Sequence, residues 1–461
     1  MTPPRVRFAP SPTGYLHVGS VRTALYNWLF ARHEGGTLLL RIEDTDEARN
    51  REEWVEGICS SLRWVGLDWD EGPFRQSERR HLYAKAAEDL EAAGRAYWCD
   101  CTREAIDARA KERGGPPGYD GFCRDRGLGR GEGRALRFRV PDEGTTVVPD
   151  LIRGEPSFPN AAIEDFVLVR TNGTPVFLLA NAVDDVDMGI THVIRGEDLL
   201  PSTPKYLLLR HALGTTDVPV FAHLPLIVNE KRQKLSKRRD PVALELYRDE
   251  GYLPEVMLNF LALMGWGPPS GREQLPVEDM VAEFRLEDVG SSSAFFDTAK
   301  LRAFNGDAIR ALPVEEFLRR AAPWLAEAAD DEAVRRLAPL VQERVVTLAE
   351  APELVAFLRV PDDGVPMDEG SWGKAMKEPA GAALERAEVR LGELDGWTAD
   401  GVRAALDAVA EDVAVGKKKV HAAVRVAVTG RTVGLPLFES VEVLGRERTL
   451  ARLGAARSRM G

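Results

Sequence analysis

Apolar and polar positions near the N-terminus switch between two periodicities. Residues 5–8 have the character of a short strand, which a proline-rich loop at 9–14 ends. From Ser20 onward, apolar residues recur at spacings of three and four, which predicts a helix that the glycines at 35–36 stop. Residues 37–42 then form a second, buried type of strand. A strand, a loop, a helix and a strand in this order predict a parallel-sheet α/β domain, whose ligand binds at the carboxyl ends of the strands.

The pattern changes twice further along the chain. The stretch 79–175 looks inserted, because it combines a Cys-x-Cys sequence, a Gly/Pro-rich loop at 114–121 and short strand-like pieces. The α/β pattern resumes at 176, and after Pro241 the chain is almost wholly helical in pattern. We therefore expect one α/β domain that carries an insertion, followed by helical modules.

Length and charge narrow the class of protein. A chain of 461 residues is long enough for several domains. Its net charge of −12 is unusual for a nucleic-acid binder, but residues 230–240 hold six cationic side chains against two acidic ones, and residues 411–461 hold ten against five. A phosphate backbone could follow these local basic stripes. Without a long apolar run or a signal-like N-terminus, we expect a cytoplasmic protein with no membrane span, and four irregularly spaced cysteines predict no disulfide framework.

The proline-rich loop leads into the tetrapeptide His-Val-Gly-Ser at 17–20. The prolines stiffen the loop, and Gly14 and Gly19 let a base or a phosphate lie against the backbone. The following helix offers N–H groups and a dipole that favour phosphate, and His17 supplies a further donor. By itself the tetrapeptide is only a turn with a capped helix. In its place between a strand and a helix, it predicts a nucleotide site.

A second loop concentrates positive charge far downstream, where residues 231–239 are Lys-Arg-Gln-Lys-Leu-Ser-Lys-Arg-Arg. Such a run is most often a solvated patch or a nucleic-acid patch. At the end of the α/β region it has another option. It could fold over a triphosphate and neutralise the charge that develops in phosphoryl or adenylyl chemistry.

Further short sequences accompany these two loops. They are Arg-Phe-Ala-Pro-Ser-Pro-Thr-Gly at 7–14, Arg-Ile-Glu-Asp-Thr-Asp at 41–46, Arg-Gln-Ser-Glu-Arg at 75–79, Leu-Ala-Asn-Ala-Val-Asp-Asp at 179–185, the stretch 191–204, Leu-Met-Gly-Trp at 263–266, Thr-Gly at 429–430 and Leu-Gly-Arg-Glu at 444–447. The two loops resemble the ATP motifs of class I aminoacyl-tRNA synthetases. The whole set is similar to bacterial glutamyl-tRNA synthetase and extends over essentially the entire chain.

This resemblance implies a fold and a domain order. The fold would be a Rossmann-type class I catalytic domain with an inserted acceptor-binding subdomain, followed by an all-α anticodon-binding region. The expected boundaries are 1–78 and 176–240 for the two catalytic halves, 79–175 for the insertion, 241–312 for a helical stem-contact region and 313–461 for the anticodon-binding domain.

The resemblance also implies a reaction and its residues. L-Glutamate would attack ATP to give glutamyl-adenylate and pyrophosphate, with Mg²⁺ assisting, and the glutamyl group would pass to the terminal adenosine of tRNA(Glu). His17, Gly19 and Lys237 would be catalytic, and ATP would also contact Ser11, Ser20, Lys234 and Ser236. Arg7 and Arg195 match the family's carboxylate-binding arginines, and Glu43 matches its ammonium-binding acid. The remaining residues of the expected glutamate pocket are Ser11, Phe177 and Asn181.

Two positions depart from the family pattern. Ser20 stands where the class usually has His, although a small hydroxyl residue is common in glutamyl enzymes. Phe177 stands where related enzymes often carry Tyr, so it can keep the aromatic wall but supplies no hydroxyl donor.

The cysteines of the insertion raise the question of a metal. Cys99, Cys101 and Cys123 resemble the zinc knob of some glutamyl enzymes, and Asp125 would be the fourth ligand, where relatives often have His or Cys. The alternative is a small metal-free insertion with three inert cysteines. The sequence leaves both interpretations open.

Other interpretations are weaker. Glutaminyl-tRNA synthetase reads its anticodon with β-barrels, whereas the pattern here after Pro313 is helical. A catalytically dead paralogue would be expected to lose His17, Lys237 or Arg7, and all three are present.

Arg344 matches an arginine of the helical anticodon module that is associated with forms that discriminate between glutamate and glutamine tRNAs. The family resemblance further suggests a monomer.

Overall fold

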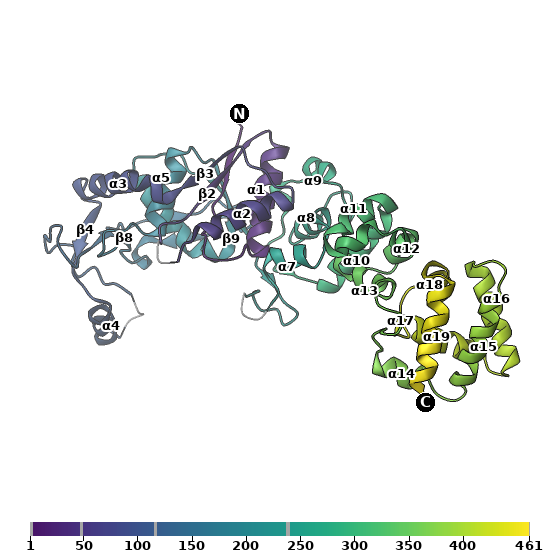
Figure 1. Cartoon of the computed structure of the whole chain (residues 1–461). Helices are drawn as coiled ribbons and strands as arrows, with labels where there is room; N and C mark the ends of the chain where they lie inside the picture. Colours follow the sequence, from purple (N-terminus) through teal and green to yellow (C-terminus); the bar gives the residue numbers. More distant parts are fainter. Residues whose placement is uncertain (1–2, 47–48, 115–117, 237–239, 461) are drawn as a thin grey trace. The chain divides into compact units, whose positions relative to one another are not determined.

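The computed structural model describes residues 3–46, 49–114, 118–236 and 240–460. The chain folds into two compact units (Figure 1). The first comprises Met1–Arg248 and Pro254–Thr298, and the second comprises Asp249–Leu253 and Ala299–Gly461. Each unit is described by itself below.

The first unit begins with a parallel sheet of order β1-β2-β3, made of β1 (Arg5–Phe8), β2 (Thr37–Ile42) and β3 (Glu71–Arg75). Helix α1 (Val18–His33) connects β1 to β2, and α2 (Glu52–Trp64) connects β2 to β3. The predicted α/β fold is confirmed. The helix expected from Ser20 begins two residues earlier, at Val18, because His17 caps it.

A second parallel pair continues this domain. Strands β9 (His192–Gly196) and β10 (Val220–Leu224) pair in parallel, with α6 (Thr203–Ala212) between them and α5 (Phe177–Asp187) before them. Hydrogen bonds between Arg5 and Thr191 join β1 to the start of β9, with Thr191 N–H donating to Arg5 O at 3.0 Å. The carboxyl ends of β1, β2 and β9 therefore meet at one edge.

The inserted stretch is a small antiparallel structure. Strands β4 (Ala96–Cys99), β5 (Ala135–Phe138) and β8 (Val167–Val169) form one sheet, and β6 (Thr145–Val147) pairs with β7 (Ser157–Pro159). Helices α3 (Arg80–Ala92) and α4 (Arg103–Glu112) complete it. One hydrophobic core runs from this sheet to α5 and α6, with Phe138, Leu179 and Phe221 in it, so the insertion and the α/β domain share buried surface.

The first unit also contains further helices and a short parallel strand pair. The helices are α7 (Leu244–Asp249), which ends the main segment of the unit, α8 (Pro254–Ala262) and α9 (Val277–Glu283). The strands are β11 (Ile227–Val228) and β12 (Ala294–Phe295). Arg22 of α1 reaches the carbonyl oxygens of Met264 and Pro225, which fixes α1 against this region.

The regular secondary structure described in the second unit consists of helices. Its helices are α10 (Thr298–Ala311), α11 (Val314–Leu325), α12 (Glu332–Gln342), α13 (Ala351–Val355), α14 (Glu369–Ala375), α15 (Ala380–Gly392), α16 (Ala399–Asp412), α17 (Lys417–Thr429), α18 (Leu437–Leu444) and α19 (Arg446–Met460). Among the described residues, no helix is long and apolar enough to cross a membrane.

Strand β3 approaches β2 closely at Gly72. The register between the strands shifts here, because Leu39 faces Glu71 and Arg41 faces Phe74. Gly72 has φ of 100°, and a Cβ on this residue would overlap the carbonyl oxygen of Leu40.

We predict that Gly72→Ala destabilises the protein more than Gly66→Ala does. Gly66 also has positive φ, at 81°, but no atom lies within 4 Å of a Cβ there, so its substitution should cost only ~1–2 kcal/mol of backbone strain. Gly72→Ala must in addition displace β2, which should lower the free energy of unfolding by a further ~1–3 kcal/mol. Urea unfolding of the two variants compares them, and equal midpoints would contradict the close approach.

Candidate amino-acid and ATP site

A cavity of about 280 Å³ lies at the carboxyl ends of β1, β2 and β9. Every residue that the sequence analysis assigned to glutamate lines this cavity: Arg7, Ser11, Glu43, Phe177, Asn181 and Arg195. The structure thus brings together residues from β1, the proline-rich loop, the end of β2, α5 and β9. Their roles toward a ligand stay predictions.

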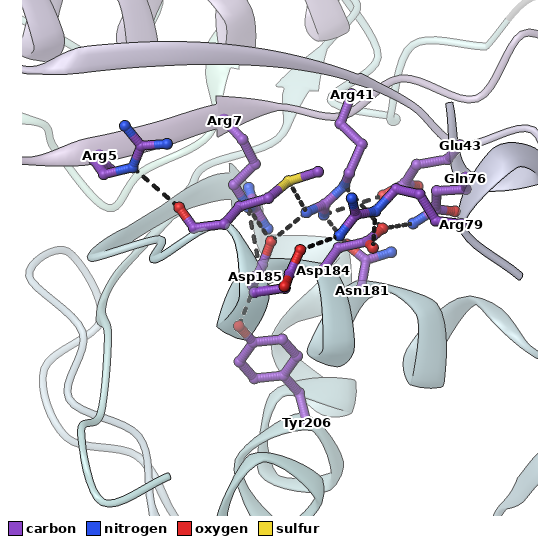
Figure 2. A network of polar contacts seen from close by, with 12 residues as sticks. Arg5, Arg7, Arg41, Glu43, Gln76, Arg79, Asn181, Asp184, Asp185 and Tyr206 are labelled. Atoms are coloured by element: carbon purple, nitrogen blue, oxygen red, sulfur yellow. Dashed lines mark hydrogen bonds and ion pairs between the residues drawn. The ribbon is translucent and has the colours of Figure 1, made fainter. Parts of the chain in front are cut away.

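Asp185 holds the cationic side of this cavity in place (Figure 2). It is fully buried on α5 and accepts hydrogen bonds from Arg7 Nε at 3.2 Å, from Arg41 at 2.6 Å and from the Tyr206 hydroxyl at 2.9 Å. Burial alone would raise the pKa of Asp185, but the charges of Arg7 and Arg41 outweigh it and hold that pKa below its usual range. The carboxylate is therefore ionised and orients Arg7 through its Nε.

Arg41 links this carboxylate to the acid of the pocket. Its guanidinium is fully buried, donates to Asn181 Oδ1 at 2.7 Å and lies 3.8 Å from Glu43. Glu43 is buried as well, and its N–H donates to the carbonyl of Pro10, which ties the proline-rich loop to the end of β2. Burial raises the pKa of Glu43 to about 7, against the opposing effects of Arg41 and of a hydrogen bond with Asn181.

Asp184 fastens the neighbouring elements. It accepts hydrogen bonds from Gln76 at 2.9 Å and from Arg79 at 2.8 Å (Figure 2). The Tyr83 hydroxyl donates to it as well, at 2.9 Å. These partners include two residues of the sequence 75–79, so this sequence holds α5 in place. It does not line the cavity.

The sequence motifs assign no ligand-binding role to Arg41, Asp184 or Asp185. A signal for them does exist in the sequence, because each is a charged residue inside an otherwise apolar element. A charge at such a position is costly unless it is paired, so it indicates a buried ion pair, although not which residues form it.

A second cavity, of about 410 Å³, lies beside the first and shares Ser20, Thr23 and Gly196 with it. His17, Gly19 and Lys234, three of the residues predicted to contact ATP, also line it, and their role toward ATP stays a prediction. Ser11 lines only the amino-acid cavity, and Ser236 lines neither cavity.

The start of α1 differs from the expectation of open N–H groups. Gly19 N–H donates to His17 Nδ1 at 2.9 Å, and the N–H groups of Ser20 and Val21 donate to the His17 carbonyl oxygen. A neutral His17 ring therefore carries its proton on Nε2. A phosphate in this cavity would meet the His17 ring rather than uncapped amides. An added Cβ on Gly19 would lie 3.1 Å from that ring, which explains the glycine.

Lys234 of the basic loop lines this second cavity, and its ammonium pairs with Asp198 at 2.8 Å. Ser236 N–H donates to Asp240. Lys237, predicted to be catalytic, lies outside the described residues.

The three cysteines of the insertion gather at one point. The sulfur atoms of Cys99, Cys101 and Cys123 all lie within 4.8 Å of one another. Asp125 does not join them, which corrects its prediction as the fourth ligand. Its side chain is 81% exposed and pairs with Arg139 at 3.2 Å, because the turn after Cys123 directs it away from the sulfurs. The Tyr119 hydroxyl instead contacts Cys99 and accepts the N–H of Cys123 at 2.8 Å.

In the second unit, Arg344 follows α12 and donates to the carbonyl oxygen of Gly434 at 3.2 Å. Gly434 belongs to the loop 429–435, which lines a cavity of about 780 Å³ together with residues 365–368. Arg344 thus holds one wall of this cavity, through Gly434. Its role toward an anticodon stays a prediction.

Comparison with known proteins agrees with this geometry. Residues 4–303 match the family of class I tRNA synthetases (E and Q), catalytic domain, and residues 316–457 match an anticodon binding domain family. The chain therefore belongs to the class I aminoacyl-tRNA synthetases, as the sequence motifs predicted.

Individual relatives specify the branch of this class. The chain is 57% identical over 471 residues to the glutamate–tRNA ligase of Salinispora arenicola, with 99% of each chain covered, and 56% identical over 471 residues to that of Thermobifida fusca, covering 98% and 97%. A solved glutamate–tRNA ligase of Elizabethkingia meningosepticum, in complex with its amino acid, superimposes with a TM-score of 0.85 at 33% identity over 100% of both chains. Within its class, the chain is a member of the glutamate–tRNA ligase family.

The raised pKa of Glu43 predicts how glutamate binding depends on pH. Only the ionised carboxylate attracts an ammonium group, and in the empty pocket Glu43 takes up a proton as the pH falls through about 7. We expect the KM for glutamate to rise below that pH, by up to about tenfold per pH unit. Steady-state kinetics over this range measures it. Glu43→Gln should bind glutamate weakly and without this pH dependence, and a flat profile in the unaltered protein would contradict the assignment.

Proposed function

We propose that the protein is a glutamate–tRNA ligase, which activates L-glutamate with ATP and transfers it to the terminal adenosine of tRNA(Glu). The observation that carries this proposal is the charge of the amino-acid cavity. Arg7, Arg195 and Glu43 line it and are all buried. Two cations and one anion complement the two carboxylates and the one ammonium group of glutamate.

The activation step needs positioned cations rather than a base. The α-carboxylate of glutamate is already ionised near neutral pH, so it can attack the α-phosphate of ATP directly. His17 lines the ATP cavity and can donate from Nε2 toward the phosphates, and we assign Lys237 to the same task. Of the residues around this cavity, Asp198 is a carboxylate that could help the phosphates to hold Mg²⁺, which would neutralise phosphate charge when bound.

The aromatic wall of the pocket is compatible with this function. Phe177 begins α5 and lines the cavity, while its carbonyl oxygen accepts a hydrogen bond from Asn181 at 3.2 Å. The Phe177 ring supplies a surface for the methylene groups of the substrate but has no polar group. The polar contacts of the substrate must therefore come from the other residues of the pocket.

The second unit is the proposed anticodon reader. The regular elements described in this unit are all helices, which distinguishes it from the β-barrel readers of glutaminyl enzymes, and Arg344 bonds to Gly434 in the wall of its cavity. We further propose a cytoplasmic monomer. Charging assays with purified tRNA(Glu) and tRNA(Gln) define the tRNA scope.

Glutamate-dependent ATP–pyrophosphate exchange tests the function. We expect exchange in the presence of tRNA(Glu), because enzymes of this family usually activate their amino acid only with tRNA bound. Lys237→Ala should lower the exchange rate by about 10²–10³-fold, as for loss of one charge-stabilising group, while tRNA affinity stays unchanged. Lys231→Ala, in the same basic loop, is the matched control and should leave the rate unchanged. No exchange with or without tRNA would refute the enzyme assignment.

We also propose that the insertion binds a structural Zn²⁺ ion. Three sulfur atoms at mutual distances of no more than 4.8 Å suit a tetrahedral metal, and a structural site needs a fourth ligand. We assign the fourth ligand position to the hydroxyl oxygen of Tyr119, which contacts Cys99, in place of Asp125. The alternative, a metal-free cluster of thiols, predicts no bound metal.

Metal analysis of the purified protein separates these alternatives. We expect one zinc per chain, loss of zinc in Cys123→Ser, and full zinc content in Asp125→Ala, because Asp125 lies away from the sulfurs. Absence of zinc from protein purified without chelators would favour the metal-free cluster. A loss of zinc in Asp125→Ala would show that Asp125 is a ligand after all.

A further inference from the structure

Arg195 differs from the other arginines of the amino-acid pocket in its partners. Its side chain is only 5% exposed, yet no carboxylate of the described residues forms a salt bridge with it. Its Nε donates to His223 Nε2 at 3.2 Å, and a terminal nitrogen donates to Thr203 Oγ1 at 2.8 Å. Burial and the nearby charge of Arg7 lower the pKa of Arg195 to about 10. A buried cation with only neutral partners leaves its charge to be balanced by a ligand.

His223, in β10, is fully buried, and its hydrogen bonds fix its tautomer. Its Nδ1 lies 2.5 Å from Asp150 Oδ2, and its backbone N–H donates to the same oxygen at 3.0 Å. An ionised carboxylate can only accept, so the proton of the neutral ring sits on Nδ1. The lone pair of Nε2 then faces Arg195 and the Thr203 hydroxyl, which is 3.0 Å away.

Both carboxylate oxygens of Asp150 accept hydrogen bonds from backbone N–H groups. Its Oδ1 accepts the N–H groups of Ile152 at 2.9 Å and Arg153 at 2.7 Å. The chain around it runs beside β10, because Leu151 N–H donates to Phe221 O at 2.9 Å. Asp150 belongs to the inserted stretch between β6 and β7, so the insertion supplies the last member of the series Asp150–His223–Arg195.

Aromatic rings and one further cation complete the surroundings. The Arg195 guanidinium lies 5.7 Å from the centre of the Tyr206 ring and 5.9 Å from that of Phe221, while the His223 ring stacks on Phe221. Arg153 donates from Nε to the carbonyl oxygen of His223 at 3.2 Å and pairs with Glu197. The rings restrict the plane of the guanidinium, and the hydrogen bond to Nε2 restricts its rotation within that plane.

We propose that His223 and Asp150 are positioning residues for amino-acid recognition, with His223 as the neutral acceptor that aims Arg195 at a substrate carboxylate and Asp150 as the group that fixes the tautomer of His223. This inference rests on the proposed glutamate–tRNA ligase function. It does not make either residue catalytic, since both act through Arg195.

The test compares His223→Phe with His223→Gln. Phenylalanine keeps an aromatic ring against Phe221 but has no acceptor, whereas the glutamine side-chain oxygen can take the place of Nε2. We expect His223→Phe to raise the KM for glutamate by about 10–100-fold, the usual effect of losing a hydrogen bond to a charged group. The KM values for ATP and tRNA and the kcat should stay within about twofold. His223→Gln should recover most of the affinity for glutamate.

Asp150→Asn probes the tautomer. The amide NH₂ would donate to Nδ1, which moves the ring proton to Nε2 and removes the acceptor for Arg195. The same selective rise in the KM for glutamate is therefore expected. His192→Phe is the matched control, because His192, on β9, contacts Thr191 and Phe30 and lies outside both cavities. It should leave all constants near those of the unaltered protein.

The outcomes separate the inference from the function. If the unaltered protein exchanges pyrophosphate with glutamate but His223→Phe keeps the original KM, the inference is refuted and the function stands. If all the constants of His223→Phe worsen together, or glutamine gives no recovery, His223 is only structural and the inference is again refuted. If the unaltered protein shows no glutamate-dependent exchange, the proposed function fails and the inference with it.

Discussion

The architecture of the candidate amino-acid site depends on one buried carboxylate, that of Asp185. Two guanidinium groups, from Arg7 on β1 and Arg41 on β2, would repel each other in the interior without an anion between them. Asp185 on α5 binds both and also accepts the hydroxyl of Tyr206 on α6. Four elements are thereby fixed around one charge. Removing only one partner of such a group leaves the others buried and unpaired, which is far costlier than the net value of the pair. Because of this cost, alternative arrangements of the four elements that break one of these contacts are disfavoured.

The same reasoning explains how a cavity with cationic walls can be selective. Arg7 and Arg41 have an internal counter-ion, whereas Arg195 has only neutral acceptors. Glu43 is buried deeply enough that its pKa rises to about 7. The pocket therefore contains one cation and one acid whose charges are incompletely balanced by the protein. A ligand with a carboxylate and an ammonium group at the right separation satisfies both, and a ligand that lacks either leaves a buried charge unpaired.

The sequence predicted more of the fold and of the pocket lining than of what holds the pocket together. Arg7, Glu43, Asn181 and Arg195 occur in recognisable motifs, and strand ends bring them to one cavity. The counter-ions act through other residues, so their sequence signal is only a charge in an apolar run. Asp125 illustrates a different limit, because spacing alone cannot tell which way a side chain points after a turn. Likewise, the sequence predicted open amides at the start of α1, whereas Gly19 N–H bonds to the His17 ring and the next two amides bond to the His17 carbonyl oxygen.

The contact between Asp150 and His223 is the clearest example of a feature that the sequence pattern could not predict. No motif surrounds Asp150, and it belongs to a stretch that looked like a separate module. Its neighbours nevertheless bond to Phe221 in β10, and its carboxylate meets His223 behind the amino-acid cavity. Residues outside the inserted stretch thus do not satisfy His223 by themselves, since a buried neutral imidazole needs a partner for its N–H. The insertion supplies that partner. Amino-acid recognition and the subdomain expected to hold the acceptor end of the tRNA therefore share one hydrogen-bonded structure.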